Sequence, residues 1–366
     1  MRSEMDEKMM KKRIAAVAGK LKGRHLDGAV ITDRANVRFL TGFLGDDSWA
    51  LVLGRRTWLL TDSRYTEQAQ GECVGCKIIE RKDSLEKELA KITGRFKSVK
   101  ILGIENTTSL ALFDTIRKNL KTKLKKMPSL VRKIRAIKEP GEISNLRKAN
   151  NIADNALEQA LKHLRIGMTE AALAGILELQ IRRLGALAAF ETIVCFGANA
   201  SRPHHIPGKR KLRANDTILI DFGAKYKGYN SDKTRCFTVG KVKRRFQRAY
   251  EAVALAQKTA IDLIVDGVKA KDIDAAARKI IKDSGFPVFG HGLGHGLGME
   301  VHELPVLYPK SKDKLTAGQV ITVEPGIYIP GKFGIRIEDN ILVTDTGCKI
   351  ISRTKAPPPL LTLKCK

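Results

Sequence analysis

Two histidines, His291 and His295, lie four residues apart in the glycine-rich run HGLGHGLG, residues 291–298. Because glycine has no side chain, backbone and ligand can approach these imidazoles closely. Four carboxylates lie in apolar, strand-like segments on either side of this run: Asp221, Asp232, Glu324 and Glu338. A protein interior does not tolerate four carboxylates and an imidazole together unless cations neutralise them. The chain is therefore expected to fold so that these side chains surround metal ions.

Length and composition are those of a folded protein with more than one domain. The chain has 366 residues, which is long for one domain and comfortable for two. Its formal charge is +28, because 67 basic residues oppose 39 acidic ones. We interpret the excess as a solvated basic surface and do not expect a nucleic-acid partner. Zinc-finger spacing is missing from the sequence, and aromatic residues make up only 5% of it.

The sequence carries few signals for a membrane or an oxidising compartment. No apolar run reaches the length of about eighteen residues that a transmembrane helix needs, and no apolar stretch long enough for a signal peptide follows residues 8–13. Cys73 and Cys76 form a lone CxxC pair among six cysteines. We expect reduced thiols and a cytoplasmic location.

Hydrophobic periodicity predicts an α/β domain in the first third of the chain. Helices are expected at 7–23, at 110–120 and directly after 62–65, and strands at 28–32, 49–53, 57–61 and 101–105. A basic stretch then leads to Pro140, which is typical of the first turn of a helix. We divide the chain into an N-terminal domain (1–132), a linker (133–141) and a C-terminal domain (142–366).

The C-terminal domain combines helices with strand-like runs. Helices are expected at 143–166, 169–185, 246–266 and 271–284, with Thr169 as an N-cap. Strand-like runs occupy 217–225, 229–239, 320–324 and 335–343. The predicted fold class is α+β.

A predicted hairpin brings two of the carboxylates together. A turn at Lys227-Gly228 would pair residue 226 with 229 and residue 223 with 232. Asp221 and Asp232 would then share a face of the sheet, about 7 Å apart. Carboxylates this close repel each other unless they are protonated, paired with cations or bound to metal.

The candidate donor set has one imidazole, His295, and the four carboxylates. Such an oxygen-rich set suits Mn²⁺, Co²⁺ or Fe²⁺ better than a thiolate-rich zinc site would. Two divalent ions would nearly neutralise it, and would activate a water and polarise a scissile carbonyl. This chemistry predicts a hydrolase. The other histidines, His204, His291 and His302, are candidates to donate hydrogen bonds to developing charge.

At these residues the sequence resembles the pita-bread-fold metallopeptidases, the family of methionine aminopeptidase and prolidase, and specifically their Xaa-Pro aminopeptidase and prolidase branch. All five metal positions of that family are filled in chain order. Segments 27–32, 38–43 and 60–65 are similar to a creatinase-type N-terminal domain, and the part from Glu142 is similar to the catalytic domain. The resemblance implies a creatinase-type N-terminal α/β domain followed by a C-terminal pita-bread catalytic domain.

The resemblance also implies how the metals are held. Asp221 would bind one ion, and His295 and Glu324 would bind the other, while Asp232 and Glu338 would bridge both. Glu324 would also accept the proton of the nucleophile as general base. Two divalent ions per chain are implied, with Mn²⁺ preferred and Co²⁺, Fe²⁺ or Zn²⁺ as alternatives, and a homodimer is expected.

Four more residues receive roles from the same resemblance. His302 would stabilise the tetrahedral intermediate, and His204 and His291 would contact the substrate backbone. The match at 204 could shift by one residue, because a second histidine follows. Arg336 would orient the carboxylate of Glu338.

The implied reaction removes the N-terminal residue that precedes a proline. Related short prolidases place an Arg shortly after their His-Glu pair, where it binds the C-terminal carboxylate of a dipeptide. Here Val306 stands where that Arg is expected, after His302-Glu303. We therefore expect an Xaa-Pro aminopeptidase that acts on proline-containing peptides, with an Xaa-Pro dipeptidase (prolidase) as the alternative.

Two further alternatives follow from the same fold. A creatine amidinohydrolase does not use this metal set. A non-catalytic relative would bind nucleic acid or ribosomes through basic clusters such as 117–126, 209–213 and 241–248. Such a relative is expected to lose metal donors, and this chain retains all five.

Overall fold

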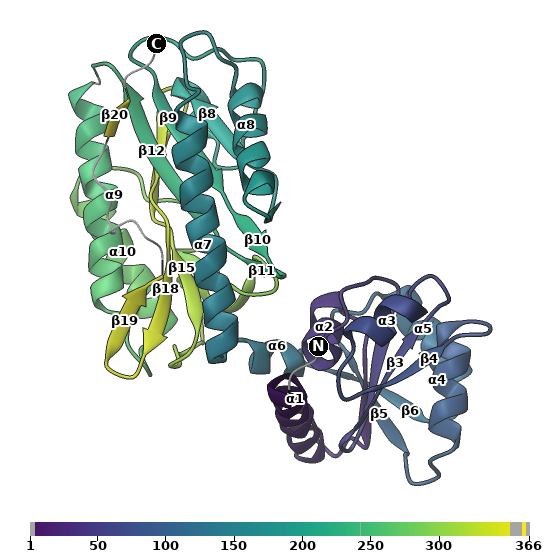
Figure 1. Ribbon diagram of the computed structural model, residues 1–366. Helices are drawn as coiled ribbons and strands as arrows, with labels where there is room; N and C mark the ends of the chain where they lie inside the picture. Colours follow the sequence, from purple (N-terminus) through teal and green to yellow (C-terminus); the bar gives the residue numbers. More distant parts are fainter. Residues whose placement is uncertain (1–3, 242, 352–360, 364–366) are drawn as a thin grey trace. The chain divides into compact units, whose positions relative to one another are not determined.

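In the computed structural model the chain divides into two compact units, Met1–Arg135 and Ala136–Lys366 (Figure 1). The structure describes residues 4–241, 243–351 and 361–363. Within these ranges, none of the helices combines the length and the apolar character needed to cross a membrane.

The N-terminal unit is an α/β domain around one sheet. Its helices are α1 (Glu4–Lys22), α2 (Arg34–Thr41), α3 (Thr66–Glu72), α4 (Leu85–Gly94), α5 (Leu110–Asn119) and α6 (Leu130–Arg135). Its strands are β1 (Gly28–Ile31), β2 (Trp49–Leu53), β3 (Arg56–Thr61), β4 (Lys77–Glu80), β5 (Ile101–Glu105) and β6 (Lys123–Met127). The strand order is β4-β3-β2-β1-β5-β6, and β4 and β6 form its edges. The predicted strands are all present, whereas the charged edge strands β4 and β6 escaped prediction because they lack an apolar run.

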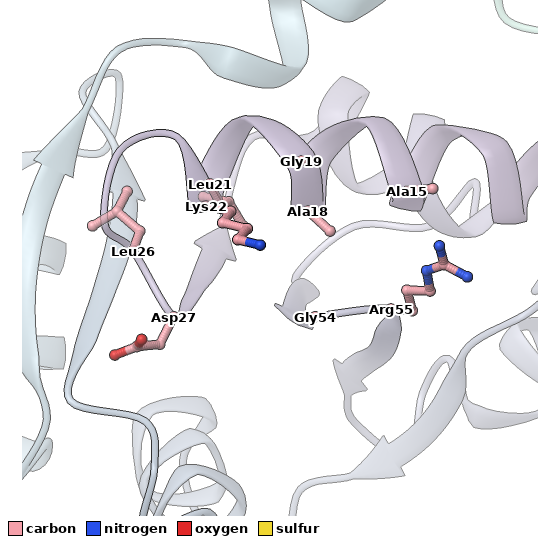
Figure 2. A pocket seen from close by; sticks show the side chains of 9 residues that line it. All are labelled: Ala15, Ala18, Gly19, Leu21, Lys22, Leu26, Asp27, Gly54 and Arg55. Atoms are coloured by element: carbon pink, nitrogen blue, oxygen red, sulfur yellow. The ribbon is translucent and has the colours of Figure 1, made fainter.

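A hollow of about 500 Å³ lies beside α1 in this unit (Figure 2). It is lined by Ala15, Ala18, Gly19, Leu21, Lys22, Leu26, Asp27, Gly54 and Arg55. None of the predicted site residues lines it.

The C-terminal unit packs four long helices against mainly antiparallel sheets, in which β20 alone among the described strands pairs in parallel, with β12. The helices are α7 (Pro140–Leu161), α8 (Glu170–Arg183), α9 (Arg244–Asp262) and α10 (Ala270–Asp283), with a short 3₁₀ helix η1 (Gly197–Ser201). The first group of strands is β7 (Leu187–Ala188), β8 (Ile193–Phe196), β9 (Thr217–Phe222), β10 (Ala224–Tyr226), β11 (Tyr229–Asn230), β12 (Lys233–Val239) and β20 (Leu361–Leu363). The second group is β13 (Gly294–Gly296), β14 (Glu303–Leu307), β15 (Val320–Val323), β16 (Gly326–Ile329), β17 (Phe333–Arg336), β18 (Asp339–Thr344) and β19 (Gly347–Ile350). Pro140 and Thr169 begin α7 and α8 as predicted.

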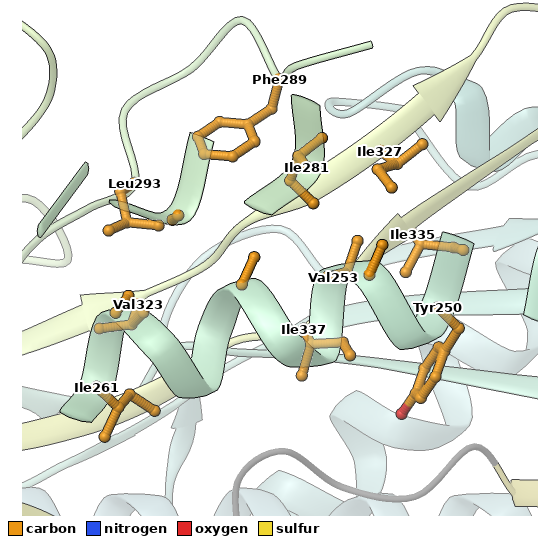
Figure 3. Close-up of a cluster of buried hydrophobic side chains, with 14 of the residues drawn as sticks. Tyr250, Val253, Ile261, Ile281, Phe289, Leu293, Val323, Ile327, Ile335 and Ile337 are labelled. Carbon is orange, nitrogen blue, oxygen red and sulfur yellow. The ribbon is translucent and has the colours of Figure 1, made fainter. Parts of the chain in front are cut away.

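Two apolar clusters hold these helices to the sheets. One lies under α9 and α10 and includes Tyr250, Val253, Ile281, Val323 and Ile335 (Figure 3). The other lies under α7 and α8 and takes in residues of β8, β9 and β12. The sheet β20-β12-β9-β8 therefore has an apolar cluster on each face.

Alternation along β9 decides which way its carboxylate points. Ile220 and Phe222 belong to the cluster under α7 and α8, whereas Leu219 belongs to the cluster under α9 and α10. Because successive side chains of a strand point to opposite faces, Asp221 lies on the Leu219 side. Cross-strand partner Thr234 lies on that side as well.

The predicted hairpin register is confirmed. Tyr226 pairs with Tyr229 next to the turn, and Phe222 pairs with Lys233 further along the hairpin. Both pairs have the register in which residue 223 lies opposite residue 232. The runs 217–225 and 229–239 are nevertheless each broken in two, at Gly223 and at 231–232. A Cβ on Gly223 would lie 2.0 Å from the carbonyl oxygen of Ser231, so only glycine allows this close approach.

One predicted strand was wrong as a single element. Residues 335–343 are divided between β17 and β18, which belong to different sheets. The chain leaves one sheet at Ile337 and joins the next at Asp339, and between them the N–H of Glu338 donates to the carbonyl of Thr234. Glu338 therefore lies at a junction between sheets.

Candidate metal centre

The structure brings three of the five predicted donors into one cluster. One ligand atom from each of Asp232, His295 and Glu338 lies within 4.8 Å of the other two. They come from the start of β12, from β13 and from the junction before β18. Asp232 and Glu338, more than one hundred positions apart in the chain, thus meet at a distance that a metal ion can span.

His295 presents one ring nitrogen to this cluster. Its Nδ1 lies 3.1 Å from the carbonyl oxygen of Gly296, which favours a hydrogen on that atom. Its Nε2 lies 3.7 Å from Oδ2 of Asp232 and 3.4 Å from Oε1 of Glu324. Burial alone would lower the pKa of His295, but these two carboxylates raise it to about 9. A proton and a metal ion are alternative cations for the same Nε2.

Glu324 is the fourth donor near this imidazole. Burial would raise the pKa of Glu324, but the hydrogen bond with His295, together with attraction to His295, His291 and Arg336, lowers the pKa. Thr322 donates to Oε1 of Glu324 at 3.4 Å and accepts from the N–H of His295 at 3.0 Å. One hydroxyl therefore connects both residues.

Asp221, the fifth donor, is held by Arg336. Nη2 of Arg336 donates to Oδ2 of Asp221 at 2.6 Å, and Nε donates to Oγ1 of Thr234 at 2.9 Å. Thr234 in turn donates to Oε2 of Glu338 at 2.8 Å. Arg336 is therefore connected to the carboxylate of Glu338 through the Thr234 hydroxyl. That Arg336 orients this carboxylate stays a prediction.

Unsatisfied oxygen atoms show that the site fits cations. Oδ1 of Asp221 and Oε1 of Glu338 are buried and have no hydrogen-bond partner among the described residues. Burial, with repulsion between neighbouring carboxylates, raises the pKa values of Asp221, Asp232 and Glu338. Buried polar atoms normally have partners, so a set of carboxylates held this way is arranged for metal.

The remaining histidines surround this centre in different ways. The rings of His302 and His295 are 4.4 Å apart, edge to face. His291 lies 3.0 Å from the hydroxyl of Tyr328, to which Arg336 also donates. His204 is exposed and lies three residues after the end of η1.

Two contacts of the centre had no counterpart in the sequence reasoning. Thr234 was missed, although the correct hairpin register pairs it with Asp221 and would have revealed it. Asn340 was missed as well. Its amide donates to the carbonyl of Asp232 and its Oδ1 accepts from the N–H of the same residue, which fixes the backbone of that donor. No local pattern signals a contact across 108 positions.

The fold and the candidate metal centre together indicate a metal-dependent hydrolase built on two units. Residues 144–345 match the model of metallopeptidase family M24, and residues 13–137 match the creatinase/prolidase N-terminal domain. The chain therefore belongs to metallopeptidase family M24. The expected α+β fold, with a creatinase-type N-terminal domain and a pita-bread C-terminal domain, is confirmed, and the chain is a metal-dependent peptidase of this family.

Individual relatives cover nearly the whole chain. The uncharacterized peptidase YqhT of Bacillus subtilis (strain 168) is 39% identical over 92% of this chain and 96% of its own length. The structure of Xaa-Pro dipeptidase from Bacillus anthracis is 34% identical with a TM-score of 0.93, and covers 97% of this chain and 100% of its own. The structure of X-Pro aminopeptidase from Thermotoga maritima MSB8 is 33% identical with a TM-score of 0.84. It covers 93% of this chain and 99% of its own. Identity alone does not separate the two activities.

Proposed function

We propose that this chain is an Xaa-Pro aminopeptidase, which removes the N-terminal residue of a peptide whose second residue is proline. The observation that carries this choice is the position of Val306. It is the direct cross-strand partner of His295 in the pairing of β13 with β14. Directly opposed residues on antiparallel strands share a face, with Cβ atoms about 5 Å apart. The side chain at position 306 can therefore contact a substrate that binds next to the imidazole of His295.

The side chain at 306 bears on how the far end of a substrate is received. In short prolidases, by the family resemblance, an Arg here would bind the C-terminal carboxylate of a dipeptide. Val306 carries no charge and is 37% exposed. A longer peptide can extend past it without leaving a cation unpaired, which supports cleavage of Xaa-Pro-Xaa substrates.

The chain's own residues then supply the rest of the reaction. Two divalent cations, which we expect to be Mn²⁺, would activate the attacking water and polarise the scissile carbonyl. Asp221 would bind one ion, His295 and Glu324 the other, and Asp232 and Glu338 both. Oε1 of Glu324 would accept the proton of the water.

Histidines around the donors would receive the substrate. His302 would donate to the oxygen of the tetrahedral intermediate, because its ring stacks edge to face on that of His295. His204 and His291 would contact the substrate backbone. A homodimer and a cytoplasmic location remain predictions.

The second candidate is an Xaa-Pro dipeptidase. This candidate is favoured by the structure of Xaa-Pro dipeptidase from Bacillus anthracis, whose TM-score of 0.93 exceeds the 0.84 of the Thermotoga maritima aminopeptidase.

The two candidates are separated by substrate length. Purified protein stripped of metal and reloaded with Mn²⁺ is assayed on Ala-Pro and on Ala-Pro-Ala, with Asp232→Ala as the inactive control. Release of free alanine from the tripeptide is expected. Cleavage of the dipeptide alone would establish the dipeptidase, and cleavage of neither would reject both.

A further inference from the structure

A buried carboxylate at the start of α8, that of Glu170, lies against the segment 196–208, which carries His204. Its Oε1 accepts hydrogen bonds from the backbone N–H of Phe196 at 2.7 Å and from the side-chain amide of Asn199 at 2.8 Å. Glu170 is fully buried, with 0% of its surface exposed. Glutamates are almost never buried so completely unless they are partnered, so these contacts account for its position.

The other oxygen of Glu170 binds the far end of the same segment. Oε2 accepts from the N–H of Gly208 at 3.2 Å and lies 2.9 Å from Nε2 of His205. Because an ionised carboxylate accepts and does not donate, Nε2 of His205 carries the hydrogen. Four donors between residues 196 and 208 therefore converge on one side chain.

This contact distinguishes two consecutive histidines. His205 is turned inward, with only 9% of its side chain exposed. His204, directly before it in the chain, is exposed. Of the two histidines His204 is therefore the one that a ligand can reach, because the inner one is held by Glu170.

The segment is also held from the opposite side. A Cβ on Gly334 would lie 1.7 Å from the carbonyl oxygen of Ala200, so η1 packs directly on the backbone of β17. Gly334 precedes Arg336 by two residues on this strand. The segment 196–208 is therefore fixed between α8 and the strand that carries Arg336.

We propose that Glu170 is a positioning residue for substrate binding: its carboxylate turns His205 inward and so presents His204 to the peptide. This inference rests on the proposed function, in which His204 contacts the substrate backbone. None of the five metal donors lies in the segment 196–208. We therefore expect a substitution at Glu170 to weaken the substrate contact and to leave the metal content unchanged.

A labelling experiment tests the geometry without any substrate. Diethyl pyrocarbonate modifies accessible neutral imidazoles, and peptide mass spectrometry then locates the label. In the native full-length protein His204 is expected to be labelled and His205 protected. In Glu170→Gln, the amide replaces an acceptor with a donor, and His205 should become labelled as well. Continued protection of His205 in a folded Glu170→Gln variant overturns the proposal.

Two substitutions at His205 test the same contact if the Glu170→Gln variant does not fold. His205→Gln keeps a nitrogen donor at the Nε2 position, whereas His205→Ala removes it. Native-like labelling of His204 is expected in the first variant and altered labelling in the second. Identical behaviour of the two variants overturns the proposal.

Kinetics on Ala-Pro-Ala test whether Glu170 acts through His204. Glu170→Gln is expected to raise KM about tenfold or more with metal content unchanged, since small misplacement of a binding group is costly. His204→Ala should then add little in the Glu170→Gln background. Fully multiplicative losses overturn the proposal. A wild-type protein that does not cleave the tripeptide refutes the proposed function, while the labelling result still decides the geometry.

Discussion

Arg336 donates a hydrogen bond of 2.6 Å to the carboxylate of Asp221, across 115 positions of the chain. The same guanidinium donates to Thr234 and to the hydroxyl of Tyr328, both at 2.9 Å. Arg336 is only 4% exposed. One planar cation therefore connects Asp221 on β9, a candidate metal donor, with β12 and β16.

Arg336→Lys tests this arrangement, because lysine keeps the charge but loses the planar fork. Contacts that orient metal donors typically contribute about 10- to 100-fold to affinity or activity. We expect kcat/KM on Ala-Pro-Ala to fall by about that factor, and metal to dissociate more readily on dialysis. Arg183→Lys on the exposed side of α8 is the matched control. Activity within twofold of the wild type would show that the fork is dispensable.

Asp232→Asn tests the metal centre itself. Asp232 lies in the cluster with His295 and Glu338, and an amide cannot replace its charge. We expect about two ions per chain in the wild type, about one or fewer in the variant, and loss of peptidase activity. Elemental analysis after dialysis measures the ions, with the exposed Asp345→Asn as control. Retention of both ions by Asp232→Asn would contradict the assigned donor set.

Local signals in the sequence predicted the contacts within hairpins and helices. The turn at Lys227-Gly228 sets the pairing of β9 with β12, so their register followed from the turn. The hydrogen bond of Arg336 with Asp221 could not be predicted from the sequence, because β17 ends at Arg336 and the next strand belongs to another sheet.

Contacts between segments that are distant in the chain could not be predicted from the sequence pattern. Glu170 looks like an ordinary acidic residue in the first turn of a helix, where the dipole favours a negative charge. Its partners lie 26 to 38 positions away in an irregular segment. Tertiary structure alone reveals that its carboxylate is buried.

Val306→Arg should shift substrate preference toward dipeptides. The introduced guanidinium would lie opposite His295, where it could bind the C-terminal carboxylate of Ala-Pro. We expect the ratio of Ala-Pro to Ala-Pro-Ala hydrolysis to rise about tenfold or more. Val306→Gln adds length without charge and should leave the ratio close to that of the wild type. An equal shift in both variants would assign the effect to size.

Glu105 should make the N-terminal unit less stable as the pH rises. This side chain is 1% exposed, and burial raises its pKa to about 7 from a usual value of 4.5. Between these values the folded unit holds a proton that the unfolded chain has released. Its stability therefore falls as the pH rises from about 4.5 to about 7, by up to roughly 3 kcal/mol.

Fluorescence can follow this unit alone, because both tryptophans, Trp49 and Trp58, lie in β2 and β3. Urea unfolding is measured at several pH values for the wild type and for Glu105→Gln. The variant should lose the downward slope between about pH 4.5 and 7, whatever constant offset the amide introduces. An unchanged slope would assign the pH dependence to other groups.

Lys138 and Glu303 form an ion pair inside the C-terminal unit. Nζ of Lys138 lies 3.0 Å from Oε2 of Glu303, with side chains 1% and 3% exposed. Glu303 also accepts from the N–H of Glu300 and directly follows His302. The pair therefore connects the first residues of the C-terminal unit with the loop that carries His302, a proposed catalytic residue.

Lys138→Met should be strongly destabilising, because removing one partner leaves the other charge buried without its counter-ion, at a cost of about 3–5 kcal/mol. Urea unfolding followed by circular dichroism measures this loss. Adding Glu303→Gln removes the uncompensated charge, so the double variant should recover part of the stability. kcat should stay low in both variants, since the loop bearing His302 loses its anchor. If the two substitutions were simply additive, the ion pair would not be the source of the effect.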